Sequence, residues 1–397
     1  MNYKNYKIDG SPEQDICINK CYKVKADIAN CFPSIYTHAI TWALAGKEKA
    51  KAKKNQNTSN DWYHNLDSSI TWLNYGETHG LLIGPHSSNL VSEIILVSID
   101  NKLAKYKYIR HIDDYTCYVS SIDEANQFLL DLSQSLREFN LTLNHKKTEI
   151  IKLPTPFEED WIRKLKLFKM ETYKKQIKYT GVVPFFDMAL ELMKENKYNG
   201  SILNYAIKIL LKKKMTKNAQ TYFINIIHHL VLIYPYLIPL LEKIFDEGLI
   251  QSKQMSIIST NIFKLGIEKN IYEAMIYALY FALKYNFKIK CKTIAKTNQI
   301  QNKEDCILML LSYLYDKKYN KDLKFYIDTA KSYIIKTTLK TEEINIIDDE
   351  FWLFAYEVLR IESPKNLDKC IDWKQLKNKK ITFLNRENLA IKGIKGV

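Results

Sequence analysis

The sequence has 397 residues, a hydrophobic share of 46% and a formal net charge of +15. A chain of this length and composition can fold into two or three domains with buried cores. It contains no run of about 18 apolar residues, which argues against a membrane-spanning helix. The polar start MNYKNYKIDG lacks the apolar region of a secretory signal. Seven scattered cysteines fit reduced thiols, so we expect a cytoplasmic protein with no membrane partner.

The positive charge is concentrated in the second part of the chain. Residues 1–154 hold 18 Lys/Arg and 17 Asp/Glu, so the remaining residues hold 41 and 27, a net charge of +14. A basic region of this size would attract a polyanion such as nucleic acid. A codon bias toward Lys, Asn, Ile and Tyr, as in an AT-rich genome, would explain the same excess.

The first half mixes strand and helix patterns. Residues 22–27 alternate, with Val24 and Ala26 on one face, which predicts a half-buried strand. A helix is predicted over 34–44, and the Lys-rich stretch 47–60 is predicted to be exposed. After the glycine turn 80–84, Ser87 or Ser88 is predicted to cap a helix. In this helix, Leu90, Ile94 and Val97 are predicted to share one face.

The next segment predicts a hairpin and a helix. Residues 106–112 and 115–120 are expected to form two strands joined by Asp113 and Asp114. Asp123 is expected to cap a helix whose apolar side is formed by Phe128, Leu129, Leu132 and Leu136. Short strands are predicted over 141–143 and 149–153. After about residue 156, helical spacing dominates, as at Ala206 and Leu210, which favours an α-solenoid without a repeat clear enough to assign to a family.

Three aspartates form the candidate site. Two-residue hairpins usually carry Asn-Gly or Asp-Gly, whereas Asp113-Asp114 places two negative charges side by side. A bound cation would offset this repulsion; the alternative is a solvated acidic turn. Asp27 ends a separate predicted strand, and carboxylates from two strands can converge on two metal ions about 4 Å apart. Oxygen ligands and phosphates are what Mg²⁺ prefers, so Mg²⁺ is the expected cofactor.

Four motifs in order resemble the palm of reverse transcriptases. They are DIANCF at 27–32, GLLIGPHSS at 80–88, the hairpin YIRHIDDY at 108–115, and LTLNHKKT at 141–148. The text CFPSIYTH, the GPHSS turn and the helical second half are similar to bacterial abortive-infection and defence-associated (antiphage) reverse transcriptases. The resemblance covers residues 22–155 well and the helical half loosely.

The resemblance implies roles for individual residues. Asp27, Asp113 and Asp114 would be catalytic and would bind metal, and the backbone carbonyl of Ile28 would add a ligand. Nucleotide-binding roles fall on four further residues. Phe32 would exclude a ribose 2′ hydroxyl, Gly84 and Pro85 would let the backbone approach the incoming base pair, and Lys147 would lie near the triphosphate. Core packing at Phe32, a plain helix entry at Gly84 and a solvated lysine at Lys147 remain the alternatives.

The expected fold class is α+β, a palm with an antiparallel sheet followed by an all-α helical-repeat domain. We expect a short segment at 1–21, the palm at 22–155 with a polar insertion near 47–75, and the helical domain at 156–397. Only 26 residues precede Asp27, too few for the fingers subdomain of the family, and Ile83 stands where many members carry glutamine.

The predicted function is RNA-directed or template-independent DNA synthesis in antiphage defence. The resemblance implies deoxynucleoside triphosphates as substrates, DNA or RNA as a partner, and a possible homo-oligomer. The alternative is a catalytically impaired palm scaffold whose helical half binds nucleic acid or protein.

Overall fold

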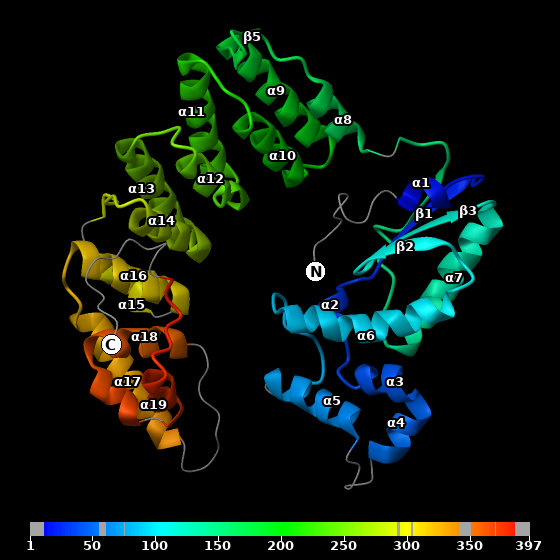
Figure 1. Cartoon of the computed structure of the whole chain (residues 1–397), viewed down its shortest axis with the longest axis horizontal. Helices are drawn as coiled ribbons and strands as arrows, with labels where there is room; N and C mark the ends of the chain where they lie inside the picture. Colours follow the sequence, from blue (N-terminus) through cyan, green and yellow to red (C-terminus); the bar gives the residue numbers. More distant parts are fainter. Residues whose placement is uncertain are drawn as a thin grey trace. The chain divides into compact units, whose positions relative to one another are not determined.

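The computed structural model describes residues 12–54, 61–74, 76–156, 158–291, 294–302, 305–340, 351–369 and 371–385. The chain divides into two compact units, unit 1 up to Phe157 and unit 2 from Glu158 onward (Figure 1). Part of the expected polar insertion, residues 55–60 and Tyr75, lies outside the described residues. In the described part of the chain, no helix combines the length and apolar character needed to cross a membrane.

Unit 1 contains a four-stranded antiparallel sheet with strand order β2-β3-β1-β4. Its elements in chain order are α1 (Pro12–Ile16), β1 (Tyr22–Asp27), α2 (Cys31–Ser34), α3 (Ala39–Ala45), α4 (Lys47–Lys54), α5 (Trp62–Leu73), α6 (His86–Lys102), β2 (Tyr108–His111), β3 (Asp114–Val119), α7 (Ile122–Glu138) and β4 (Glu149–Lys152). Helix α7 packs on β1 and β3, α6 packs on α7, and α3 joins α6 to α4 and α5 (Figure 1).

The two faces of the sheet have different environments. Val24 and Ala26 of β1 are fully or almost fully buried and lie opposite Cys117 and Tyr115 of β3, both in the core. Because side chains alternate along a strand, Asp27 points to the other face. The predicted strand 22–27 is confirmed residue for residue as β1.

Several predicted element boundaries in unit 1 are wrong. The helix expected over 34–44 is broken, because Ile35 is extended and Thr37 donates its backbone N–H to Thr78 at 2.9 Å. The stretch expected to be exposed begins with α4, and the described side chains of residues 47–52 are exposed apart from Ala50. Helix α6 begins at His86 with Pro85 as N-cap, not at a serine cap. The cap of α7 is Ser121, whose hydroxyl accepts the N–H of Glu124, rather than Asp123. The strand expected over 141–143 is reduced to a single bridge between Leu143 and Ile28.

The buried face of α6 also differs from the prediction. Its core-facing residues include Ser92, Ile95 and Ile99, whereas Leu90 is 62% exposed and Val97 is 46% exposed. Two helical stripes were available in this sequence, and the helix packs through the one that contains small serines. The stripe that contains Leu90 and Val97 is exposed to solvent.

Within its described residues, unit 2 is helical apart from one short hairpin. Its elements are α8 (Asp160–Leu167), β5 (Thr172–Tyr173), β6 (Gln176–Ile177), α9 (Tyr179–Glu195), α10 (Gly200–Leu211), α11 (Lys217–Ile233), η1 (Pro235–Leu237), α12 (Leu240–Asp246), α13 (Ser252–Lys269), α14 (Tyr272–Lys284), η2 (Ile294–Lys296), α15 (Asn298–Gln301), α16 (Cys306–Tyr319), α17 (Lys324–Lys340), α18 (Trp352–Glu362), η3 (Pro364–Lys369) and α19 (Ile371–Asn378). Helices near in sequence pack together, and their buried residues form one core (Figure 1). The expectation of an all-α second domain is therefore wrong at β5–β6, where the chain pairs Thr172 with Ile177.

Candidate metal centre

Two strand ends bring the three aspartates together. Asp27 is the last residue of β1 and lies opposite Asp114, the first residue of β3, in antiparallel register. The N–H of Ile28 donates to the carbonyl of Asp113 at 3.2 Å, which places the third aspartate beside the same strand end. Carboxylate oxygens of Asp27, Asp113 and Asp114 all lie within 4.8 Å of one another. This separation matches the size of a two-ion centre, whose ions are about 4 Å apart.

The hairpin tip is held in a strained conformation by α6. Ile112 has a φ of 59°, in the left-handed region that a β-branched residue rarely adopts. Such a residue costs about 1–3 kcal/mol and persists only where its surroundings fix it. Arg110 supplies the fixing contact, because its Nη1 donates to the carbonyl of Ile112 at 3.0 Å.

Arg110 is itself anchored by two carboxylates of α6. Its guanidinium bonds both oxygens of Glu93 at 2.9 Å and reaches Asp100 at 2.7 Å, and its side chain is only 11% exposed. Tyr108 donates its hydroxyl to the same Asp100 at 2.7 Å. The turn that carries Asp113 is therefore tied to α6 by a partly buried ionic network.

The loop of the fourth motif approaches Asp27 from the other side. Asn144 donates its backbone N–H to the Asp27 carbonyl at 2.8 Å and its Nδ2 to the Asp27 Oδ2 at 2.9 Å. Lys147 lies 3.3 Å from the same carboxylate, and its side chain is 65% exposed. Thr148 donates its hydroxyl to the Asn144 carbonyl at 2.9 Å and closes the turn. Asn144 thus fixes the direction of the Asp27 carboxylate and leaves the lysine head group accessible.

The charges of the cluster are only partly compensated. Burial, followed by the nearby Asp27 charge, raises the pKa of Asp113, while Lys147 acts in the opposite direction. Burial and the charges of Asp113 and Asp27 also raise the pKa of Asp114. Three carboxylates face one lysine, so the site has an excess of negative charge. The donor set consists of hard oxygen atoms, and it fits a divalent cation such as Mg²⁺.

The remaining predicted site residues lie around α2 and the start of α6. Phe32 is half-buried and packs against the core of unit 1, and its carbonyl accepts the N–H of Leu81 at 2.9 Å. Gly84 has a φ of 117° with open space where a Cβ would stand. Pro85 caps α6. Within the residues that the structure describes, no hydrogen bond or ion pair joins Gly84 or Pro85 to the three aspartates.

Sequence reasoning missed two supporting residues. Asn144 stood inside the fourth motif, and its position before a polar turn was the only signal of its contact with Asp27. Glu93 was indistinguishable from any polar residue on a helix, because its partner Arg110 lies 17 positions away.

Residues 8–183 match the family model described as reverse transcriptase (RNA-dependent DNA polymerase). The match covers the sheet, the three aspartates and the loop of Asn144, and it extends past unit 1 into α9. No curated protein matches the chain. The chain therefore carries a reverse transcriptase domain, followed by a helical region that the family model does not cover.

Proposed function

We propose that the chain is a Mg²⁺-dependent DNA polymerase that uses deoxynucleoside triphosphates in an RNA-directed or template-independent reaction. One observation carries the proposal: three carboxylates from two separate strands converge within 4.8 Å at the motifs of a reverse transcriptase domain. Two bound Mg²⁺ ions would activate the attacking 3′ hydroxyl and neutralise the leaving pyrophosphate.

Asp27 and Asp113 are the metal ligands of this proposal, and Asp114 completes the carboxylate set. The backbone carbonyl of Ile28 is proposed as a further ligand, because Ile28 is bonded to Asp113 at the same strand end. Asn144 keeps the Asp27 carboxylate in one orientation, so the site needs little rearrangement when the ions bind.

Lys147 is proposed to contact the triphosphate. Its ammonium lies against Asp27, and its high exposure leaves it able to reach an incoming polyanion. An ammonium near the leaving pyrophosphate offsets its charge and donates a proton to it. Phe32 is proposed to select deoxyribose, because it follows Asp27 in the first motif as the residue that excludes a 2′ hydroxyl does in the reverse transcriptases it resembles. Gly84 and Pro85 are proposed to form the loop that lies along the incoming base pair.

A cytoplasmic role in antiphage defence is the biological part of the proposal. It rests on the likeness of CFPSIYTH and GPHSS to defence-associated reverse transcriptases and on the helical region that follows the domain. Plating phage on cells that express the wild-type chain or an inactive variant tests it. Equal phage yields with the two proteins would contradict the defence role and leave the chemistry untouched.

The chemistry is tested by incorporation of labelled deoxynucleotides in Mg²⁺. We expect Asp113→Ala with Asp114→Ala to abolish incorporation while the protein stays folded, as judged by circular dichroism. Asp123→Asn is the matched control, because Asp123 is an exposed acid of the same unit with no part in the site. Undiminished incorporation by the double variant would refute the site. A wild-type chain that incorporates nothing would favour the alternative, a palm scaffold whose helical half binds nucleic acid or protein.

A further inference from the structure

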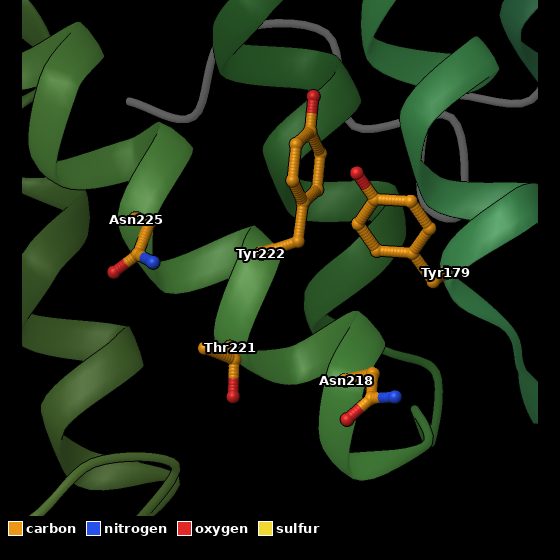
Figure 2. A pocket seen from close by; sticks show the side chains of 5 residues that line it. All are labelled: Tyr179, Asn218, Thr221, Tyr222 and Asn225. Atoms are coloured by element: carbon orange, nitrogen blue, oxygen red, sulfur yellow. The ribbon is translucent and has the colours of Figure 1, made fainter.

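A polar groove with two tyrosines lies on unit 2, between the start of α9 and the face of α11. It has a volume of about 500 Å³ and is lined by Tyr179, Asn218, Thr221, Tyr222 and Asn225. Figure 2 shows the two rings beside one another, with the three polar side chains spread along the helix that carries Tyr222. The ring centroids are 5.3 Å apart in an edge-on arrangement, and Tyr179 is 48% exposed.

Packing explains only Tyr222 on the groove side of α11: it is half-buried and its ring contacts Phe186 of the core, whereas Asn218, Thr221 and Asn225 are exposed. The four lining residues of α11 are spaced at positions 218, 221, 222 and 225, which lie on one face of a helix. Neighbouring positions such as Phe223 and Ile227 supply the core instead. The side-chain amides of Asn218 and Asn225 form no hydrogen bond with any residue in the described part of the chain. Each amide offers donors and an acceptor to a ligand.

A cluster of exposed lysines adjoins one end of the groove. Lys212–Lys214 connect α10 to α11, and Lys217 directly precedes Asn218. The carbonyl of Lys214 accepts the N–H of Ile177 at 2.9 Å, which fastens this connection beside β6 and the Tyr179 end of α9. Among the residues that the structure describes, none of these four lysines has an acidic partner. Their charge is therefore available to a ligand.

The nearby acids leave the groove basic. Glu171 is bound by the ammonium of Lys178 and the hydroxyl of Thr180, so its charge is compensated. Asp187 also acts on the groove: burial, followed by the Asp187 charge, raises the pKa of Tyr222. The Tyr222 ring therefore stays a neutral phenol with a face suited to stacking.

We propose that this surface binds single-stranded nucleic acid. Unpaired bases stack on Tyr179 and Tyr222, base edges bond to Asn218 and Asn225, and phosphates lie against Lys212–Lys214 and Lys217. Aromatic faces beside a basic track are the combination that single-strand binding uses, and bases held in a duplex cannot reach such rings. The surface belongs to the part of the chain beyond residue 183, apart from Tyr179, and its binding does not depend on the chemistry proposed for unit 1.

The test is binding of a fluorescent oligodeoxythymidine of about 16 nucleotides to the full chain in EDTA, where a metal-dependent reaction cannot run. Tyr179→Ala with Tyr222→Ala is expected to weaken binding by about 5- to 150-fold for each base whose stacking is lost. The double Phe variant at the same positions keeps the rings and should bind as the wild type does. Tyr198→Ala is the control for an exposed tyrosine elsewhere on unit 2.

The lysines are tested by the dependence of binding on salt. Charge reversal of Lys212, Lys213 and Lys214 to Glu should lower the salt slope by about 2 or more, because each phosphate contact contributes about 0.7 for a single strand. The matched control reverses the exposed Lys253, Lys264 and Lys269 of α13, which also lack an acidic partner in the described structure.

Three results would overturn the proposal. The first is wild-type affinity in the Tyr179→Ala, Tyr222→Ala variant, and the second is an equal loss in both lysine variants. The third is duplex DNA that binds as tightly as the single strand. Any of these would assign the groove to another ligand, such as a protein partner, whether or not unit 1 polymerises nucleotides.

Discussion

Neutralising the aspartate pair should stabilise the metal-free protein, although it removes the proposed activity. In Asp113→Asn with Asp114→Asn, the side chains keep their size while the mutual repulsion with Asp27 disappears. The raised pKa values of Asp113 and Asp114 give the sign. Ionising a carboxyl whose pKa is raised in the folded state lowers stability at every pH above that value. The gain in the variant should therefore be full near neutral pH and shrink as pH falls through the raised values.

The size of the gain follows from the separation of the carboxylates. At 4.8 Å, repulsion between two unit charges is about 0.9 kcal/mol in bulk water and about 3.5 kcal/mol at an effective dielectric constant of about 20. Asp114 is exposed and Asp113 only half-buried, so solvent screening favours the lower figure. We expect the variant to gain about 1–2 kcal/mol, or about 2–8 °C in Tm for a unit of this size.

The assay is thermal unfolding of both proteins in EDTA and in a Mg²⁺ titration. At ten times its Kd, Mg²⁺ should stabilise the wild type by about 1.4 kcal/mol, because it binds only the folded state. The Tm of the variant should not respond to Mg²⁺. The difference in stability between the variant and the wild type should therefore become smaller or change sign as Mg²⁺ is added. The reasoning is refuted if the variant is less stable than the wild type in EDTA, or if Mg²⁺ raises the Tm of both proteins equally.

Three further variants test the supports of the site. Arg110→Met should destabilise the protein by about 3–5 kcal/mol in urea unfolding, because it leaves two carboxylates of α6 without their buried partner; a loss under 1 kcal/mol would count against the network. Asn144→Ala should weaken Mg²⁺ binding by about 10- to 100-fold, measured by calorimetry, because the Asp27 carboxylate loses its orienting donor; unchanged affinity would contradict this role. Phe32→Ala should raise the incorporation of ribonucleotides relative to deoxynucleotides by about tenfold or more. An unchanged ratio would mean that Phe32 serves only core packing.

The central geometry was predictable because it depends on local patterns. Alternation in residues 22–27 fixes the face of each side chain, and a strand ending in Asp27 can pair with the hairpin strand that begins at Asp114. The proposed approach of the two aspartate sites is confirmed by their carboxylate distance. The strand register and the alternation of side chains are sufficient for this prediction. A shift of the strand pairing by one residue would turn the Asp27 side chain toward the core.

The contacts that tie the site to its surroundings were not predictable. The network of Arg110 with Glu93 and Asp100 depends on how α6 crosses the sheet, and α6 was expected to pack through a different face. That face was misjudged because Leu90 and Val97 are more hydrophobic than Ser92, whereas the helix buries Ser92 and exposes both of them. The left-handed Ile112 could not be inferred either, because its own sequence preference opposes it.

The most direct test of the account is nucleotide incorporation by Asp27→Asn, the single neutral change on the strand that does not belong to the hairpin. If the three carboxylates form one metal-dependent centre, the incorporation rate of this variant should be more than about 100-fold lower than that of the wild type. A loss of this size exceeds the usual effect of a residue that only supports a metal ligand. Its fold should be preserved, and Asp123→Asn should keep the full rate. Incorporation by Asp27→Asn at the wild-type rate would contradict the claim that Asp27 and the hairpin act as one site.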